Sequence, residues 1–96
     1  MRVVWEPRAS VDLLRIWRHI AKDRPIAARG VFDRIHGGVE ILAQSPKLGR
    51  TGRLARSREF IFADIPYLAI YRINERHKTV EILRIIHAAR NWPQED

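Results

Sequence analysis

The stretch "EFIFADIPYLAIYRINERHKTVEILRII", residues 59–86, decides the fold of this chain. Three runs rich in aromatic and β-branched residues lie within it, at residues 59–63, 66–73 and 79–86. The segments between them are short and contain proline or polar residues. Such runs favour strands, and strands joined by short connections pair in an antiparallel manner. The stretch therefore predicts a three-stranded antiparallel meander.

Two helices are predicted before the meander. An apolar stripe at helical spacing marks the first, which should end near the sequence "KDRP" at residues 22–25; its members are Ala9, Leu13, Ile16 and Ile20. Pro25 suits the first turn of a second helix, whose apolar spacing continues to Leu42. The pair Gly37 and Gly38 weakens this helix, and we expect it to mark close packing on the first helix.

The first element is a short strand, "RVVW" at residues 2–5, which Pro7 ends. With 96 residues the chain is long enough for one modest core, so we predict a single domain over residues 1–96. The order β-α-α-β-β-β predicts an α+β fold in which a helical hairpin packs on a small antiparallel sheet.

The charge of the chain is strongly positive, with 18 basic and 11 acidic residues and a formal net charge of +7. All the basic residues except Lys22, Lys47 and Lys78 are arginine. Arginine suits bidentate contacts to phosphate or carboxylate, so an acidic partner is expected, either nucleic acid or an acidic protein segment. Codon bias in a GC-rich genome is an alternative for the arginine-to-lysine ratio, but it does not explain the excess over acid.

Cysteine is absent, which excludes disulfides, thiolate metal sites and a cysteine nucleophile. The four histidines are scattered without a carboxylate cluster, so neither a metal nor another cofactor is expected. No apolar run is long enough to span a bilayer, and the opening "MRVVWEP" lacks the features of a signal peptide. We expect a cytoplasmic protein that does not interact with membranes.

A basic loop follows the predicted helices. Five cations and no acid occur within residues 47–58: Lys47, Arg50, Arg53, Arg56 and Arg58. They are enough for several phosphate contacts or for docking an acidic helix. A solvated loop without a ligand is the alternative, because no aromatic stacking residue is interleaved with the cations.

The last predicted strand carries apolar residues on both faces: Val80, Ile82 and Ile86 on one, Leu83 and Ile85 on the other. An antiparallel sheet with one solvated face should alternate more cleanly. The second face therefore needs a cover, which could be the tail bearing Trp92, a second copy of the chain, or a partner peptide.

The end of this strand is the candidate site for chemistry. His87 lies there near Arg84 and Arg90, where its titration near neutral pH could serve acid or base catalysis of RNA cleavage. The alternative is a strand-end histidine that hydrogen-bonds to the backbone. Tyr67 and Tyr71 share one face of the preceding strand and are either base-stacking groups or core residues.

Over nearly its whole length the chain resembles the RelE/ParE toxin superfamily. The resemblance rests on "SPKLGRTGRLARSREF", "PYLAIYRI" and "EILRIIHAARNWP", and its "GR-x-GR", "PY-x-x-x-YR" and "ILR-x-x-H-x-x-R-x-W" elements are most similar to the ParE-like branch. It implies the toxin of a type II toxin-antitoxin module. It also implies a ParD-like antitoxin whose acidic, disordered tail folds on the toxin in a hetero-oligomer.

The two branches of the superfamily differ in target. The resemblance implies mRNA cleavage in the ribosome for RelE-like members, and inhibition of DNA gyrase without a nuclease site for ParE-like members. Ribonuclease members carry an arginine after the aromatic residue that opens the middle strand, where it stabilises a developing negative charge. Here Leu68 follows Tyr67.

We therefore predict a ParE-like gyrase inhibitor with no catalytic residues and no direct DNA recognition by this chain alone. The alternative is a ribosome-dependent ribonuclease that uses His87, Arg84, Arg58 and Arg90. Predicted contacts to the target or the antitoxin are Arg50, Arg53, Arg56, Arg58, Tyr71, Arg84, His87, Arg90 and Trp92. We expect the antitoxin to cover the sheet face with Leu83 and Ile85, the edge of the helical hairpin, or both.

Overall fold

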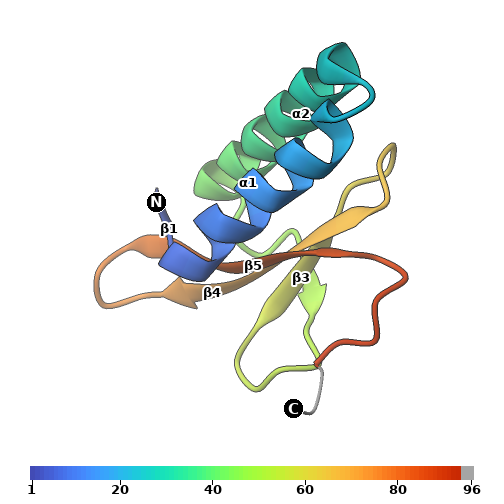
Figure 1. Cartoon of the computed structure of the whole chain (residues 1–96). Coiled ribbons are helices and arrows are strands. Elements are labelled where there is room, and N and C mark those ends of the chain that lie inside the picture. The colour runs from blue at the N-terminus through green and yellow to red at the C-terminus, as the bar shows by residue number, and fades with distance from the viewer. Residues whose placement is uncertain (94–96) are drawn as a thin grey trace.

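Two helices lie side by side across one face of a five-stranded sheet (Figure 1). The computed structural model describes residues 1–93. In chain order its elements are β1 (Arg2–Trp5), α1 (Pro7–Ala21), α2 (Pro25–Gln44), β2 (Arg50–Thr51), β3 (Arg58–Ile61), β4 (Tyr67–Asn74) and β5 (Thr79–His87). The predicted α+β class and the order of the predicted elements are confirmed. The two-residue strand β2 is an addition, and it lies inside the predicted loop.

Both helices begin at a proline, Pro7 in α1 and Pro25 in α2. Proline fits this position because its backbone is already set for a helix and it has no N–H to leave unpaired. Within α2, a Cβ atom on Gly38 would collide with the Phe62 ring, whereas Gly37 has open space beside it. The expected packing of this glycine pair on α1 is therefore wrong, because Gly38 faces the sheet and lets α2 approach it.

The strand order is β1-β5-β4-β3-β2. Neighbouring strands are antiparallel except β1, which runs parallel to β5. The sheet is therefore mixed and not wholly antiparallel as predicted. The direction of β1 is not set by a hairpin, because most of the chain lies between β1 and β5.

A β-bulge interrupts the pairing of β4 with β5, between the pairs Ile70 with Arg84 and Tyr71 with Ile82. Leu83 is the extra residue on β5. Because side chains alternate with a period of two, one extra residue exchanges the faces of all the residues that follow it. Ile85 therefore faces the helices and Ile86 faces away from them, which corrects the predicted assignment of these two residues.

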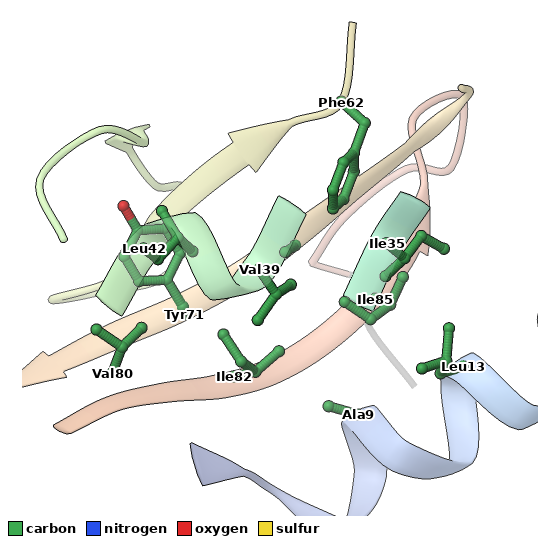
Figure 2. Close-up of a cluster of buried hydrophobic side chains, with 11 residues drawn as sticks. Ala9, Leu13, Ile35, Val39, Leu42, Phe62, Tyr71, Val80, Ile82 and Ile85 are labelled. Carbon is green, nitrogen blue, oxygen red and sulfur yellow. The ribbon is translucent and has the colours of Figure 1, made fainter. Parts of the chain in front are cut away.

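The main core lies between the helices and the sheet (Figure 2). It consists of Ala9, Leu13, Ile35, Val39, Leu42, Phe62, Ala69, Tyr71, Val80, Ile82 and Ile85. These residues come from both helices, from β4 and β5, and from the position directly after β3, so burying them fixes the hairpin on the sheet. No helix within residues 1–93 is both long and apolar enough to cross a membrane.

A smaller cluster lies on the opposite face of the sheet and consists of Leu68, Ile70 and Ile86. Leu83 and Trp92 pack against it. The chain after β5 turns away from the helices (Figure 1), and this turn carries Trp92 to the second face. Of the three covers predicted for this face, the tail bearing Trp92 is therefore present in the structure.

Candidate functional site

A polar cleft lies where β5 extends beyond its partner β1. The two strands pair only from Thr79 to Ile82, so the end of β5 lies beside α1. The cleft has a volume of about 340 Å³, and we call it the β5-end cleft. Its lining consists of Arg8, Asp12, Arg15, Ile16, Tyr67, Arg84, Ile85, Ile86, His87 and Arg90. The fold thus brings the predicted residues Arg84, His87 and Arg90 together and adds two arginines from α1.

Asp12 closes the inner wall of the cleft. Its carboxylate accepts two hydrogen bonds from Arg84, at 2.7 Å from Nε and 3.0 Å from Nη2. It also accepts the backbone N–H of Ile85 at 3.0 Å, and so satisfies a donor that β1 would satisfy if it were longer. The hydrogen bonds to Asp12 raise the pKa of Arg84, although burial lowers it. Arg84 is therefore a buried structural cation in this structure and does not face solvent as a free ligand group.

Sequence reasoning missed Asp12. The signal was a single acid on the buried side of the first helix, between Ala9, Leu13 and Ile16. A carboxylate at such a position needs a cation or several N–H donors, because an unpaired buried charge is strongly destabilising. The sequence offers fifteen arginines as partners and does not indicate which one lies near.

His87 makes local contacts at the mouth of the cleft. Its Nδ1 accepts the backbone N–H of Ala89 at 3.1 Å, and its ring makes a T-shaped contact with the ring of Tyr67, with centroids 5.4 Å apart. The alternative interpretation, a strand-end histidine bonded to the backbone, is therefore confirmed. With Nδ1 engaged, only Nε2 is left to exchange a proton with a ligand.

Two arginines of the basic loop are held by one buried carboxylate, Glu59 on β3. Arg50 Nη2 lies 2.9 Å from Oε1, and Arg53 donates to Oε2 at 3.1 Å from both Nε and its backbone N–H. Glu59 is 1% exposed. Burial alone would raise the pKa of Glu59, but the hydrogen bonds from Arg53 and Arg50 outweigh it and lower the pKa to about 2. Much of the predicted docking charge therefore serves to hold the loop.

Tyr71 anchors the start of the same loop. Its hydroxyl donates to the Pro46 carbonyl at 2.6 Å and accepts the Gly49 N–H at 2.8 Å. The side chain is fully buried, so it lies out of reach of a partner, and the predicted contact role of Tyr71 is wrong for this conformation. A Cβ atom on Gly49 would lie 2.7 Å from the tyrosine ring, which explains why glycine occupies this position.

Arg58 also supports the loop, because its Nη1 donates to the Gly49 carbonyl at 2.8 Å. It is opposite Tyr71 on β4, whereas His87 is opposite Tyr67. Four strand positions separate these sites, roughly 13 Å along the sheet. The structure therefore does not bring Arg58 to the β5-end cleft. Arg56, which has a φ of 57°, is exposed at the turn before β3.

An apolar groove runs along the helical hairpin. Two adjoining cavities of about 380 and 430 Å³ share Leu14 and Phe32, and together we call them the hairpin groove. Their other lining residues are Trp5, Ser10, Leu13, Trp17, Arg29, Asp33 and His36. Leu14 is 44% exposed and Trp17 39% exposed. Exposed apolar side chains gathered in one groove are typical of a partner-binding surface.

No candidate metal site lies within the described residues 1–93. Within residues 1–93 there is no group of three or more histidine, aspartate or glutamate side chains that could hold a metal ion. The carboxylates of Asp12 and Glu59 are instead bonded to arginines.

The family model described as the ParE toxin of the type II toxin-antitoxin system, parDE, matches residues 3–92. The chain belongs to the ParE toxin family. It is therefore a toxin of a type II toxin-antitoxin system, and the predicted superfamily is confirmed.

Similar proteins and solved structures agree with this assignment. A protein of Sinorhizobium fredii, provisionally named toxin Y4kP, is 45% identical over 93 residues, which are 97% of this chain and 94% of that protein. A structure of the chromosomal ParDE system from P. aeruginosa matches with a TM-score of 0.81 and 26% identity, covering 91% of this chain and 95% of that one.

Structures of RelBE complexes share the fold with this ParE-family toxin at lower TM-scores. The RelBE2 toxin-antitoxin complex of Mycobacterium tuberculosis matches with a TM-score of 0.60 and 26% identity, over 90% of this chain and 95% of that one. The E. coli RelBE complex matches with a TM-score of 0.64 and 14% identity, over 93% of this chain and 98% of that one, which shows a common fold alone.

Proposed function

We propose that this ParE-family toxin inhibits DNA gyrase by binding it and does not cut RNA. The observation that carries the proposal is Leu68, which stands where the resemblance implies an arginine in the ribonuclease branch. Leu68 is 2% exposed and belongs to the apolar cluster on the second face of the sheet. A buried leucine can neither donate a hydrogen bond nor stabilise a developing negative charge.

The two arginines that could replace the missing one are engaged elsewhere. Arg84 is bonded to Asp12 through two nitrogens, and Arg58 is bonded to loop carbonyls away from the β5-end cleft. A catalytic arginine has to meet the charge as it develops on the phosphate, and neither of these two is placed to do so. This arrangement supports a binding function over a catalytic one.

The direct test is a supercoiling assay with purified gyrase and micromolar toxin. We expect inhibition of supercoiling together with trapped gyrase-cleaved DNA, and both should disappear when the toxin is first mixed with its antitoxin. Unchanged supercoiling and no trapped cleavage would show that gyrase is not the target.

A cognate antitoxin with an acidic tail is the second part of the proposal. The net charge of +7, the exposed apolar residues of the hairpin groove and the ParDE and RelBE neighbours all support it. On α1 the exposed cations Arg8 and Arg15 flank the exposed apolar residues Val11 and Leu14. A helix with acidic residues beside apolar ones matches this pattern, and a second copy of this basic chain does not.

Binding of the antitoxin to the hairpin groove can be tested with matched variants. Leu14→Asp should weaken the complex by about 10-fold or more, because it places a charge inside the apolar contact. Ile26→Asp is the control, because Ile26 is 88% exposed and lies outside the lining of the groove. Equal affinities of the two variants would place the antitoxin elsewhere.

Because gyrase and the antitoxin are cytoplasmic, we propose the same location for this chain, as a hetero-oligomer.

The runner-up function is a ribosome-dependent ribonuclease. It is favoured by one observation, the meeting of Arg84, His87 and Arg90 at the β5-end cleft. In that case His87 would transfer a proton through Nε2 and the arginines would hold the phosphate. This function requires cuts in messenger RNA that depend on His87.

A further inference from the structure

The face of the sheet opposite the helices holds the largest of the described cavities, with a volume of about 520 Å³. We call it the back-face cavity. Its lining consists of Glu6, Pro7, Arg8, Leu54, Arg72, Glu81, Leu83, Arg84 and Trp92. Arg72 and Glu81 are paired across β4 and β5, and Trp92 comes from the segment after β5. The cavity lies beside the second apolar cluster and is distinct from the hairpin groove.

Two N–H donors in this lining are buried without an acceptor: Arg72 Nε and Trp92 Nε1. The Nη2 of Arg72 donates to the Ala55 carbonyl at 3.1 Å, whereas its Nε has no acceptor. Buried donors are nearly always paired in native proteins, since leaving one unpaired is destabilising. Two unpaired donors in the lining of one cavity indicate a site that lacks its acceptor.

The indole ring of Trp92 is already packed against other side chains. The Arg84 guanidinium lies over the ring, 5.3 Å from its centroid, and the ring also packs against the apolar cluster that contains Leu68. A nucleic-acid base would need a free aromatic face to stack on. The Trp92 N–H is buried and lacks an acceptor in the free chain, so a ligand that brings an acceptor to the indole edge suits this geometry better than a base that stacks on the ring.

The lining carries Arg8, Arg72 and Arg84 against Glu6 and Glu81, so its preference for a negative acceptor rests on the unpaired Arg72 donor and not on the net charge of the cavity. Glu81 is bonded to Asn74 at 3.0 Å, and Arg84 is bonded to Asp12. Arg72 keeps its unpaired Nε, and Leu83 adds an apolar wall. A ligand that places a carboxylate beside apolar side chains would satisfy these features together.

We propose that the back-face cavity binds a carboxylate side chain of an acidic amphipathic peptide, which accepts hydrogen bonds from Arg72 Nε and Trp92 Nε1. The inference rests on the proposed function only in taking the antitoxin tail as the natural source of the peptide. Both donor atoms are shielded from solvent in the free chain, so the indole and the Arg72 side chain both have to shift when the carboxylate enters.

The test follows the indole N–H resonances of the whole ¹⁵N-labelled chain by NMR. The probe is a short capped peptide of leucine and glutamate at helical spacing, and the control peptide carries glutamine in place of each glutamate. We expect a saturable downfield shift of the Trp92 indole resonance with the glutamate peptide. The control peptide should cause little change. Trp92→Phe assigns the resonance by removing it.

Two variants separate recognition from folding. Trp92→Phe keeps an aromatic ring and removes the unpaired donor, so the free chain should be as stable as the wild type or more so. Its affinity for the glutamate peptide should fall by about fivefold. Arg72→Gln should weaken binding by about tenfold, since it removes a charged donor, whereas the exposed Arg76→Gln should have no effect.

Three outcomes would overturn the proposal: no shift of the Trp92 resonance, equal binding of the two peptides, or a shift caused by an oligothymidine and not by the peptide. A loss of stability in Trp92→Phe equal to its loss of affinity would also contradict it, because the donor would then have an internal role. None of these results bears on gyrase inhibition, which is measured separately. The two proposals can therefore fail independently.

Discussion

Two buried carboxylates bind arginines on either side of the central strand β4. The two carboxylates connect different parts of the structure. Asp12 reaches from α1 to Arg84 and Ile85 on β5, more than seventy residues away in the chain. Glu59 bonds to Arg50 and Arg53, which lie nine and six residues before it. The first carboxylate joins the helical hairpin to the sheet, and the second fixes a surface loop.

The comparison shows that the basic charge of this toxin has two uses. Part of it neutralises buried acid inside the fold, as at Arg84, Arg50 and Arg53. The rest includes exposed cations such as Arg8 and Arg15 on α1. Counting arginines in the sequence therefore overstates the charge available to a partner. The two carboxylates should also respond differently to mutation, globally for Asp12 and locally for Glu59.

Asp12→Ala should have the largest effect on stability. It leaves the Arg84 guanidinium buried without its counter-charge and the Ile85 N–H without an acceptor. We expect the free energy of unfolding to fall by about 3–5 kcal/mol, measured by urea denaturation. A loss below about 1 kcal/mol would show that the pair of Asp12 and Arg84 does not hold the helical hairpin on the sheet as described.

Glu59→Gln should lower the free energy of unfolding by about 3 kcal/mol, because it removes the charge that both loop arginines contact. The damage should remain local. Hydrogen exchange should speed up most in residues 45–58, whereas the amides of α1 and α2 should lose only the protection that corresponds to the fall in global stability. Uniform loss of protection across the chain would contradict the local role of Glu59.

The pH dependence of stability tests the same carboxylate without mutation. Because the pKa of Glu59 falls from 4.5 to about 2 on folding, its contribution is complete above pH 4.5 and is lost as the pH falls toward 2. Glu59 thus contributes about 3 kcal/mol to the free energy of unfolding at neutral pH. Denaturation between pH 5 and pH 2 should therefore show a steeper loss in the wild type than in Glu59→Gln. Parallel curves would mean that the Glu59 pKa is not lowered.

Tyr71→Phe should have a smaller effect, about 1–2 kcal/mol, because it removes only the hydroxyl that bonds to Pro46 and Gly49. The ring remains to fill the core. The loosening should again appear in hydrogen exchange near Gly49. An unchanged loop would show that the hydroxyl is not its anchor.

Asp33→Asn should have the smallest effect of the series. Asp33 pairs with Arg29 one turn away on α2, and both side chains are largely exposed, at 61% and 77%. Such pairs contribute no more than about 0.5 kcal/mol. The variant thus serves as the surface control for Asp12→Ala, and a loss comparable to that of Asp12→Ala would undermine the comparison.

The fold could be predicted from local patterns, because the helical stripe from Ala9 to Ile20 and the three apolar runs after Glu59 are strong signals. The bulge at Leu83 could not, since nothing in "EILRII" marks where the register slips. The faces of Ile85 and Ile86 were exchanged for that reason. The parallel direction of β1 was also out of reach, because no hairpin connects it to β5.

The candidate site was less predictable than the fold. His87, Arg84 and Arg90 are close in sequence, so their meeting at one end of β5 followed from the strand itself. Asp12, Arg8 and Arg15 come from a distant helix, and their approach depends on packing. The buried roles of Tyr71 and Glu59 likewise depend on tertiary contacts that no local pattern reveals.

The central claim is that this toxin acts by binding, because Leu68 is buried and Arg84 is bonded to Asp12. Mapping messenger RNA ends in cells that express the wild type or His87→Ala tests it most directly. We predict growth arrest by both proteins, with no codon-phased cuts in either sample. Codon-phased cuts with the wild type that vanish in His87→Ala would contradict the claim and establish the ribonuclease.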